Sequence, residues 1–324
     1  MEERLDYTDI IVEKQGPIGY ITINHPEKRN ALVGGTIPQL SQACFEMRDD
    51  PEIRVFIIKG AGDNFCSGFY QAPTTESRIL KPPETLPKAV EWVRPVKDEP
   101  WARYARDRGG AMSNPEGQSL TARDMFFDEL WNNPTPSIAL VDSFCLGAGL
   151  WIANQCDIVY ATPNAIFSYP PIRRGASAVI SILPPWLLGR RAVLWMALTG
   201  QAISAEEAYN CGLVTKVVPE DRIESEVNKL ATSIARVPPA TNMFSKRAVN
   251  NYFEGLGIVQ AEKYAYALCV MTENSFVPGH YFDYYKKIDR LGFKEALKNQ
   301  LETYGGFDEV QERERARLKT KKGI

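Results

Sequence analysis

The chain has 324 residues, of which 44% are hydrophobic and 24% are charged, and its formal net charge at pH 7 is −2. This composition is typical of a soluble globular protein, and the near-zero net charge argues against a general binder of nucleic acid. The charged start, MEERLDYTDI, lacks the apolar stretch of a secretory signal, and no apolar run is long enough to cross a bilayer.

Strand-like and helical segments alternate along the first part of the chain. Residues 9–24 contain two β-rich runs joined by KQGP, which predicts a hairpin. Residues 36–50 have apolar side chains at helical spacing and predict a helix that ends before Pro51. Residues 54–60 form a continuous β-branched run of the kind that is buried in a parallel sheet.

The alternation continues after the middle of the chain. Residues 137–147 and 157–162 are strand-like, and the small-residue segment between them predicts a helix. An apolar helix is expected up to Gly200, and SAEE at 204–207 is a capping box that begins another helix. LVTKVVP at 213–219 predicts a last strand. This order favours right-handed βαβ units, followed after about residue 222 by helices.

Residues 72–133 do not fit the alternation. They are rich in Pro and charge, but they also carry Trp92, Trp101 and Trp131, half of the six Trp residues. Because a disordered linker has few aromatic residues, we expect an insertion that is partly helical and covers part of the surface. A mobile loop with incidental Trp residues is the alternative.

Cys and His residues limit the redox and metal chemistry. The six Cys are scattered without a Cys-x-x-Cys pair, which indicates free thiols and a cytoplasmic location. Neither of the two His residues lies near a cluster of ligand-type side chains, so we expect no metal site.

Two turns of small residues, CSG at 66–68 and LGAG at 146–149, each follow a strand-like run. A tight turn that leads into a helix leaves backbone N–H groups unpaired at the positive end of the helix dipole. Two such turns that face each other form an oxyanion hole, which suits a thioester carbonyl that gains negative charge. From spacing alone, two ordinary structural turns remain the alternative.

Four separated blocks resemble the crotonase (enoyl-CoA hydratase/isomerase) superfamily. They are ITINHPEKRNAL, VFIIKGAGDNFCSGFY, PSIALVDSFCLGAGLWIANQCDIVYATPNAIFS and LTGQAISAEEAYNCGLVTKVVP. The resemblance covers roughly residues 8–71 and 134–250. It implies an α/β fold, a crotonase-like spiral of ββα units over residues 1–220, and a helical C-terminal trimerisation region with an extended tail over 221–324. It also implies an acyl-CoA substrate, no cofactor other than that coenzyme A, no nucleic-acid or membrane partner, and a homo-trimer or dimer of trimers.

The resemblance also assigns site residues. It places the two oxyanion donors on the backbone N–H groups of Ser67 and Ala148, where the family often has Ala and Gly. It implies contacts with coenzyme A or the acyl chain for a further set of residues: Lys28, Arg29, Ala31, Gly68, Tyr70 and Gly147.

Departures from the family pattern concern the proton-transfer groups. Typical hydratases carry a Glu at the positions of Trp151 and Pro171, and neither residue present here can transfer a proton. Some ring-forming and ring-hydrolysing members use an Asp that aligns with Ala178. Tyr169 is the candidate proton donor in their place, and Arg173 could hold a substrate carboxylate.

Two functions follow from these residues. The first is an enzyme that stabilises a thioester enolate for hydration, or for hydrolytic or lyase cleavage of a C–C bond. Because Trp151 makes the pocket apolar and reshapes it, we expect a bulky, cyclic or aromatic acyl group. The second is a non-catalytic acyl-CoA-binding member of the family.

Overall fold

A computed structural model describes residues 7–33, 35–70, 129–175, 182–273, 287–288 and 290–321. The predicted insertion at 72–133 therefore lies outside the described residues up to position 128, and so do Trp92 and Trp101. Ala178 lies outside them as well. The last residues of the insertion are described, and residues 129–132 are helical as predicted.

A six-stranded sheet forms the base of the described fold, in the order β1-β2-β3-β4-β6-β9. The first two strands form the predicted antiparallel hairpin, and the others pair in parallel. Their bounds are β1 Ile10–Gln15, β2 Ile18–Ile23, β3 Val55–Gly60, β4 Ser137–Val141, β6 Ile158–Ala161 and β9 Lys216–Val217. The alternation of strands and helices was thus sufficient to predict a mainly parallel sheet.

A second sheet corrects the prediction of one strand over 137–147. The chain breaks at Asp142 and Ser143, where Ser143 has a positive φ of 53°. Thr162 donates a hydrogen bond to the Asp142 carboxylate at 2.6 Å, and the chain then leaves the first sheet. The strands β5 (Phe144–Leu146), β7 (Ile166–Ser168) and β8 (Ile203–Ser204) form the second sheet.

Helices cover the sheets, and most of them lie where the sequence pattern predicted them. The helix α1 (Thr36–Asp49) buries Leu40, Ala43 and Met47 at helical spacing, and α4 (Ala148–Gln155) is buried along its whole length. The apolar helix predicted up to Gly200 is two helices, α5 (Pro185–Leu188) and α6 (Arg190–Thr199), because Gly189 has a φ of 76° between them. The predicted capping box of Ser204 and Glu207 begins α7 (Ala205–Asn210).

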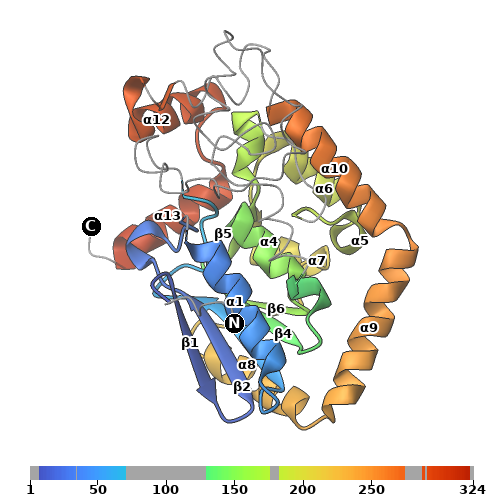
Figure 1. The fold of residues 1–324 in the computed structure, drawn as a ribbon. Coiled ribbons are helices and arrows are strands. Elements are labelled where there is room, and N and C mark those ends of the chain that lie inside the picture. Colours follow the sequence, from blue (N-terminus) through green and yellow to red (C-terminus); the bar gives the residue numbers. More distant parts are fainter. Residues whose placement is uncertain are drawn as a thin grey trace, which may run out of the picture.

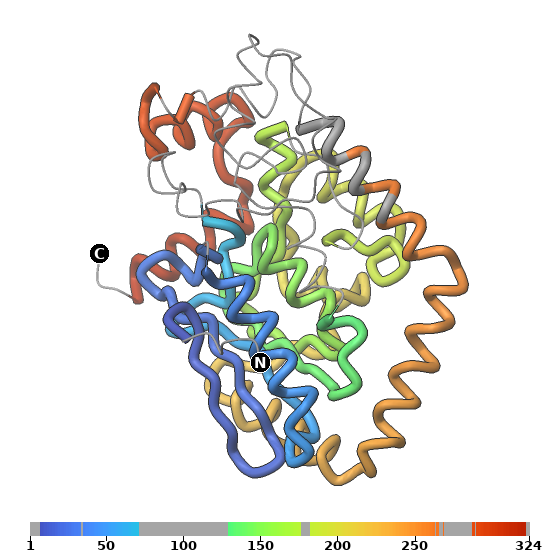
Figure 2. The backbone as a smooth tube through the Cα atoms, in the orientation of Figure 1, coloured from blue at the N-terminus to red at the C-terminus, as the bar shows by residue number. Residues whose placement is uncertain are grey.

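The C-terminal part is helical, as expected. The helix α8 (Ile223–Ala235) packs its apolar face on the six-stranded sheet. It therefore packs with the core, although its sequence lies in the predicted C-terminal region, 221–324. Figure 1 shows α9 (Pro239–Gly255) and α10 (Ile258–Glu273) along one side of the fold. The helices α12 (Phe293–Thr303) and α13 (Glu309–Lys321) return to the opposite side, as the backbone trace in Figure 2 also shows.

The main core lies between α1, α4 and the strands, with Trp151, Phe56 and Phe65 among its largest fully buried side chains. In the part of the chain that the structure describes, none of the helices is both long and apolar enough to pass through a membrane.

Candidate active site

The two small-residue turns lie side by side. Cys66 and Cys145 form an isolated parallel β-bridge, in which the Cys66 N–H donates to the Phe144 carbonyl at 2.8 Å. The Leu146 N–H donates to the Cys66 carbonyl at 2.9 Å. Because Cys66 begins the first turn and Cys145 immediately precedes the second, this bridge brings together turns that are separated by about eighty residues of sequence.

Close packing at Gly68 and Gly149 requires glycine at both turns. Gly68 has a φ of 90°, and a Cβ there would lie 2.8 Å from the Leu146 carbonyl oxygen and 3.4 Å from the Ala148 nitrogen. A Cβ on Gly149 would lie 2.5 Å from the Cys66 carbonyl oxygen. A side chain at Gly68 would thus cover the Ala148 N–H, and one at Gly149 would push the turns apart.

The Ala148 N–H is the less engaged of the two predicted donors, although Ala148 itself is buried. Ala148 is the first residue of α4, where backbone N–H groups have no partner within the helix. Its N-cap, Gly147, has a φ of 56° and offers no capping side chain. Within the described residues the Ala148 N–H has no hydrogen-bond acceptor, and the helix dipole places positive potential there.

The Ser67 N–H already has an acceptor, because it donates to the Arg29 carbonyl at 3.1 Å. The Ser67 hydroxyl donates to the Lys28 carbonyl at 3.3 Å. The second predicted donor is therefore engaged with the loop that carries Lys28 and Arg29. An anion that bound at both amides would have to share or displace that carbonyl.

The loop at residues 25–31 begins with the short helix η1 (Pro26–Lys28) and contains two non-glycine residues with positive φ, Arg29 at 55° and Asn30 at 53°. Sequence analysis did not identify Asn30, which is fully buried. Its side chain accepts from the His25 N–H at 3.0 Å and donates to the Ala61 carbonyl at 2.8 Å. The signal that could have identified it is the tolerance of Asn for this conformation.

Four of the residues predicted to contact coenzyme A meet here, three of them in this loop and one, Tyr70, beside it. The Lys28 ammonium lies 4.7 Å from the centre of the Tyr70 ring, and the Arg29 guanidinium lies 5.3 Å from the centre of the Phe144 ring. Ala31 is buried just beyond them. The loop therefore presents two cations on aromatic rings next to the first turn.

The end of β7 lies against the second turn. The Gly147 N–H donates to the Ser168 carbonyl at 3.0 Å, and a Cβ on Gly147 would lie 3.9 Å from Cγ of Pro171. Tyr169, between these two residues, is buried. Trp151 lies one helical turn after Ala148 and is buried in the main core. The structure thus places Tyr169, Pro171 and Trp151 around the second turn.

Arg173, at the end of the short helix η4 (Pro170–Arg174), is tied to the protein itself. Its guanidinium donates to the Thr199 carbonyl at 3.0 Å and to the Gly306 carbonyl at 3.4 Å, and it lies 3.9 Å from the Asp308 carboxylate. These contacts brace η4 against α6 and the C-terminal tail. A contact of Arg173 with a substrate carboxylate stays a prediction, because it requires Arg173 to give up these contacts with the protein.

Burial controls the charge of the titratable groups behind the turns. It raises the pKa of the Cys66 thiol to about 12 and raises the pKa of Cys145 well above its ordinary value, so both thiols are protonated at neutral pH. Burial also raises the pKa of Asp142, although the Thr162 hydroxyl partly opposes the shift. Among the described residues, no group of three His, Cys, Asp or Glu side chains could hold a metal ion.

Comparisons with known proteins agree with this geometry. The sequence profile of the enoyl-CoA hydratase/isomerase family matches residues 13–88 and 106–274. A probable enoyl-CoA hydratase of Mycobacterium bovis is 28% identical over 265 residues, covering 77% of this chain and 84% of that protein. (E)-Benzylidenesuccinyl-CoA hydratase of Thauera aromatica is 28% identical over 242 residues, covering 74% and 81%.

Among solved structures, an enoyl-CoA hydratase/isomerase from Xanthobacter autotrophicus Py2 has a TM-score of 0.71 to this chain at 26% identity. The match covers 91% of this chain and 98% of that one.

Proposed function

The chain belongs to the enoyl-CoA hydratase/isomerase family, and from this premise we propose that it processes an acyl-CoA whose thioester oxygen binds between the Ser67 and Ala148 N–H groups. The observation that carries this proposal is the bridge between Cys66 and Cys145, which holds the two turns side by side. Both donors are main-chain groups, so the replacement of the family's usual Ala and Gly by Ser67 and Ala148 leaves them intact.

The existing bond of the Ser67 N–H is compatible with this role. Its acceptor, the Arg29 carbonyl, is neutral and lies at 3.1 Å, whereas the thioester oxygen of an enolate carries negative charge. Hydrogen bonds to ionised acceptors are roughly twice as strong as those between neutral groups. The exchange therefore favours the enolate over the ground-state thioester, which is what catalysis requires.

Proton transfer needs a group other than the acids that the family usually carries. Trp151 and Pro171 supply no proton, and Tyr169 lies between Ser168 and Pro171 at the second turn. We assign proton donation to Tyr169, in a hydration or in a hydrolytic or lyase cleavage of a C–C bond. The reaction requires no cofactor beyond the coenzyme A of the substrate.

The two ends of the ligand follow from the surroundings of the turns. The cations Lys28 and Arg29, with Ala31 and Tyr70 beside them, would bind the coenzyme A portion. Trp151, buried beside the second turn, would have to face the acyl end, where an indole in place of a carboxylate favours a bulky, cyclic or aromatic acyl group. The name of the Thauera aromatica relative describes an aromatic acyl-CoA, which supports this choice.

A second candidate is a non-catalytic acyl-CoA-binding protein. In its favour, Trp151 and Pro171 stand where the resemblance predicts the family's two proton-transfer acids. This candidate keeps the two turns and the cationic loop as a binding site and predicts no change in the bound thioester.

A homo-trimer or dimer of trimers would cover the apolar residues that this chain exposes. Phe244 is 66% exposed, Tyr252 64% and Tyr264 67% on α9 and α10, the two helices at one side of the fold in Figure 1. Burial of such surfaces drives association. Light scattering after size-exclusion chromatography measures the assembly, and a monomer at micromolar concentration would contradict it. A cytoplasmic location stays a prediction.

A panel of enoyl- and oxoacyl-CoAs, followed by mass spectrometry, tests the activity. A product that has gained water, or released coenzyme A, identifies an enzyme, whereas tight binding with unchanged ligand identifies the second candidate. Calorimetry with an aromatic and a short-chain enoyl-CoA tests the acyl class, and tighter binding of the short chain would remove the aromatic assignment.

Two glycine variants test the oxyanion site itself. Gly68→Ala covers the Ala148 N–H and should lower turnover by about 10²–10³-fold, the usual effect of losing one oxyanion donor. Gly16→Ala is the matched control, because Gly16 also has positive φ but a Cβ there meets nothing within 4 Å. Equal loss in both variants would show that backbone strain alone is responsible.

A further inference from the structure

The C-terminal helix α13 contacts the segments that precede both turns. The Lys321 ammonium lies 2.8 Å from the Asp63 carboxylate, and Asp63 is four residues before Ser67. On the other side, Leu318 packs with Phe144 and Ile166, and Phe144 is four residues before Ala148. The helix α13 thus contacts the residues that precede both proposed oxyanion donors in the chain. It lies beyond the residues that match the family profile.

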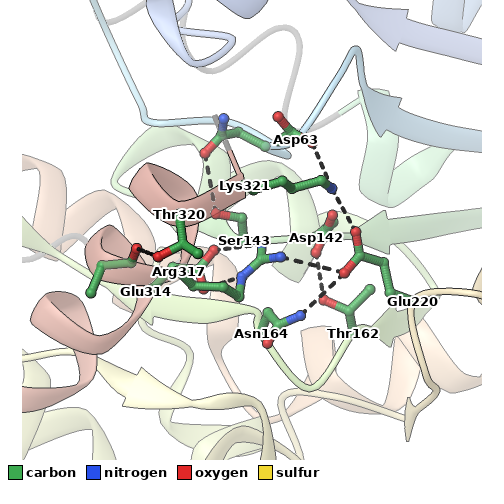
Figure 3. A network of polar contacts seen from close by, with 12 residues as sticks. Asp63, Asp142, Ser143, Thr162, Asn164, Glu220, Glu314, Arg317, Thr320 and Lys321 are labelled. Atoms are coloured by element: carbon green, nitrogen blue, oxygen red, sulfur yellow. Dashed lines mark hydrogen bonds and ion pairs between the residues drawn. The ribbon is translucent and has the colours of Figure 1, made fainter. Parts of the chain in front are cut away.

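An ionic network holds α13 in this place. Lys321 also lies 2.7 Å from the Glu220 carboxylate, and Arg317 lies 3.4 Å from the same carboxylate. Arg317 makes two further hydrogen bonds of 2.8 Å to Glu314, whose side chain is only 3% exposed. Figure 3 shows Lys321 between Asp63 and Glu220, with Arg317 beside Glu314.

The two segments that α13 contacts, just before the first and the second turn, are also hydrogen-bonded to each other. The Ser143 hydroxyl donates to the Asn64 side chain at 3.2 Å, and the Phe65 N–H donates to the Asp142 carbonyl at 2.8 Å. The residues just before the two turns therefore form one layer, and α13 covers its outer side. Asn64 and Phe65 are the residues that connect Asp63 to the Cys66 bridge.

We propose that Lys321 is a positioning residue, which acts through Asp63 to hold the first turn at the distance from the second that a thioester oxygen requires. This inference rests on the proposed function, because it assigns a purpose to the separation of the Ser67 and Ala148 N–H groups. The tail of the chain thereby becomes part of the site without touching the substrate.

A chromophoric thioester reports on this separation. The absorption of bound cinnamoyl-CoA moves to longer wavelength when hydrogen bonds polarise its carbonyl, whereas the affinity of coenzyme A alone reports on the cationic loop. In Lys321→Gln we expect a smaller wavelength shift and a two- to fivefold lower affinity for cinnamoyl-CoA relative to coenzyme A, about the effect of a partly exposed ion pair. Because Asp63 and Glu220 are partly exposed, water can solvate them and the variant should fold.

Two variants separate positioning from stability. Lys319→Gln changes an exposed cation two residues away on α13 and should leave the wavelength shift unchanged. Lys321→Arg keeps a cation opposite Asp63 and should restore the shift. Raising the salt concentration should weaken the wild-type shift toward that of Lys321→Gln, because salt screens exposed ion pairs.

The outcomes distinguish the two proposals. A full wavelength shift in folded Lys321→Gln, even with a lower melting temperature, would show that Lys321 is only structural and would overturn this inference while the proposed function stands. If wild-type protein binds cinnamoyl-CoA without any shift, the oxyanion site itself is absent, and both proposals fail.

Discussion

Gly149→Ala should separate the two turns, because Gly149 packs directly on the Cys66 bridge. The added Cβ would lie 2.5 Å from the Cys66 carbonyl oxygen and 2.8 Å from Cys66 Cβ. The first of these atoms is main chain and accepts the Leu146 N–H. Relief of the contact therefore requires movement of a strand and not the rotation of a flexible side chain.

The expected free-energy change is the difference between two effects. Alanine in a helix interior is favoured over glycine by about 0.5–1 kcal/mol, which is an upper limit for Gly149, the second residue of α4. Against this, the Cβ falls about 0.9 Å short of ordinary contact with the carbonyl oxygen, and overpacking of a closed core costs about 1–3 kcal/mol. Since the neighbour is backbone, the upper part of that range applies, and we expect a net loss of roughly 1–2 kcal/mol in the free energy of unfolding.

Urea denaturation of Gly149→Ala and Gly255→Ala measures this difference. Gly255 is the last residue of α9, and a Cβ there meets nothing within 4 Å, so this control should be as stable as wild type or slightly more stable. Gly149→Ala should also lose the wavelength shift of bound cinnamoyl-CoA. If Gly149→Ala is as stable as the control, Gly149 does not pack on the Cys66 carbonyl, and the two turns are not held together as an oxyanion site.

Three further predictions concern charge and burial. Because burial raises the pKa of Cys66 to about 12, the thiols of Cys66 and Cys145 should resist Ellman's reagent at pH 8 in the native protein and react after unfolding; rapid labelling of either in the native protein would contradict their burial. Burial raises the pKa of Asp142 in the folded protein above its ordinary value of 3.8. The folded protein therefore loses stability as pH rises above about 4 and this buried carboxyl ionises. The melting temperature of Asp142→Asn relative to that of wild type should therefore rise between pH 4 and pH 7. A difference in melting temperature that does not change with pH would refute the raised pKa of Asp142. Arg317→Met leaves Glu314 buried without its partner and should lower the free energy of unfolding by roughly 3 kcal/mol, whereas the double variant with Glu314→Met should recover most of that loss in urea denaturation.

Local signals in the sequence were sufficient for most elements of the fold. The hairpin at 10–23, α1 and the capping box of Ser204 and Glu207 depend on side-chain periodicity and on hydrogen bonds within a few residues. The strand at 137–147 was predicted wrongly, because its break at Ser143 depends on contacts of Asp142 with Thr162 and of Ser143 with Asn64. Such contacts join distant segments, and no local pattern encodes them.

The candidate site divides in the same way. The residue types at the two turns were visible in the sequence because chemistry depends on side-chain identity, and the replacement of the usual acids by Trp151 and Pro171 stays a prediction from the resemblance. The engagement of the Ser67 N–H with Arg29, the use of Arg173 as a brace and the return of α13 to Asp63 were decided only by the tertiary structure. A backbone N–H or a guanidinium can bind many acceptors, and only the folded chain determines which acceptor lies within reach.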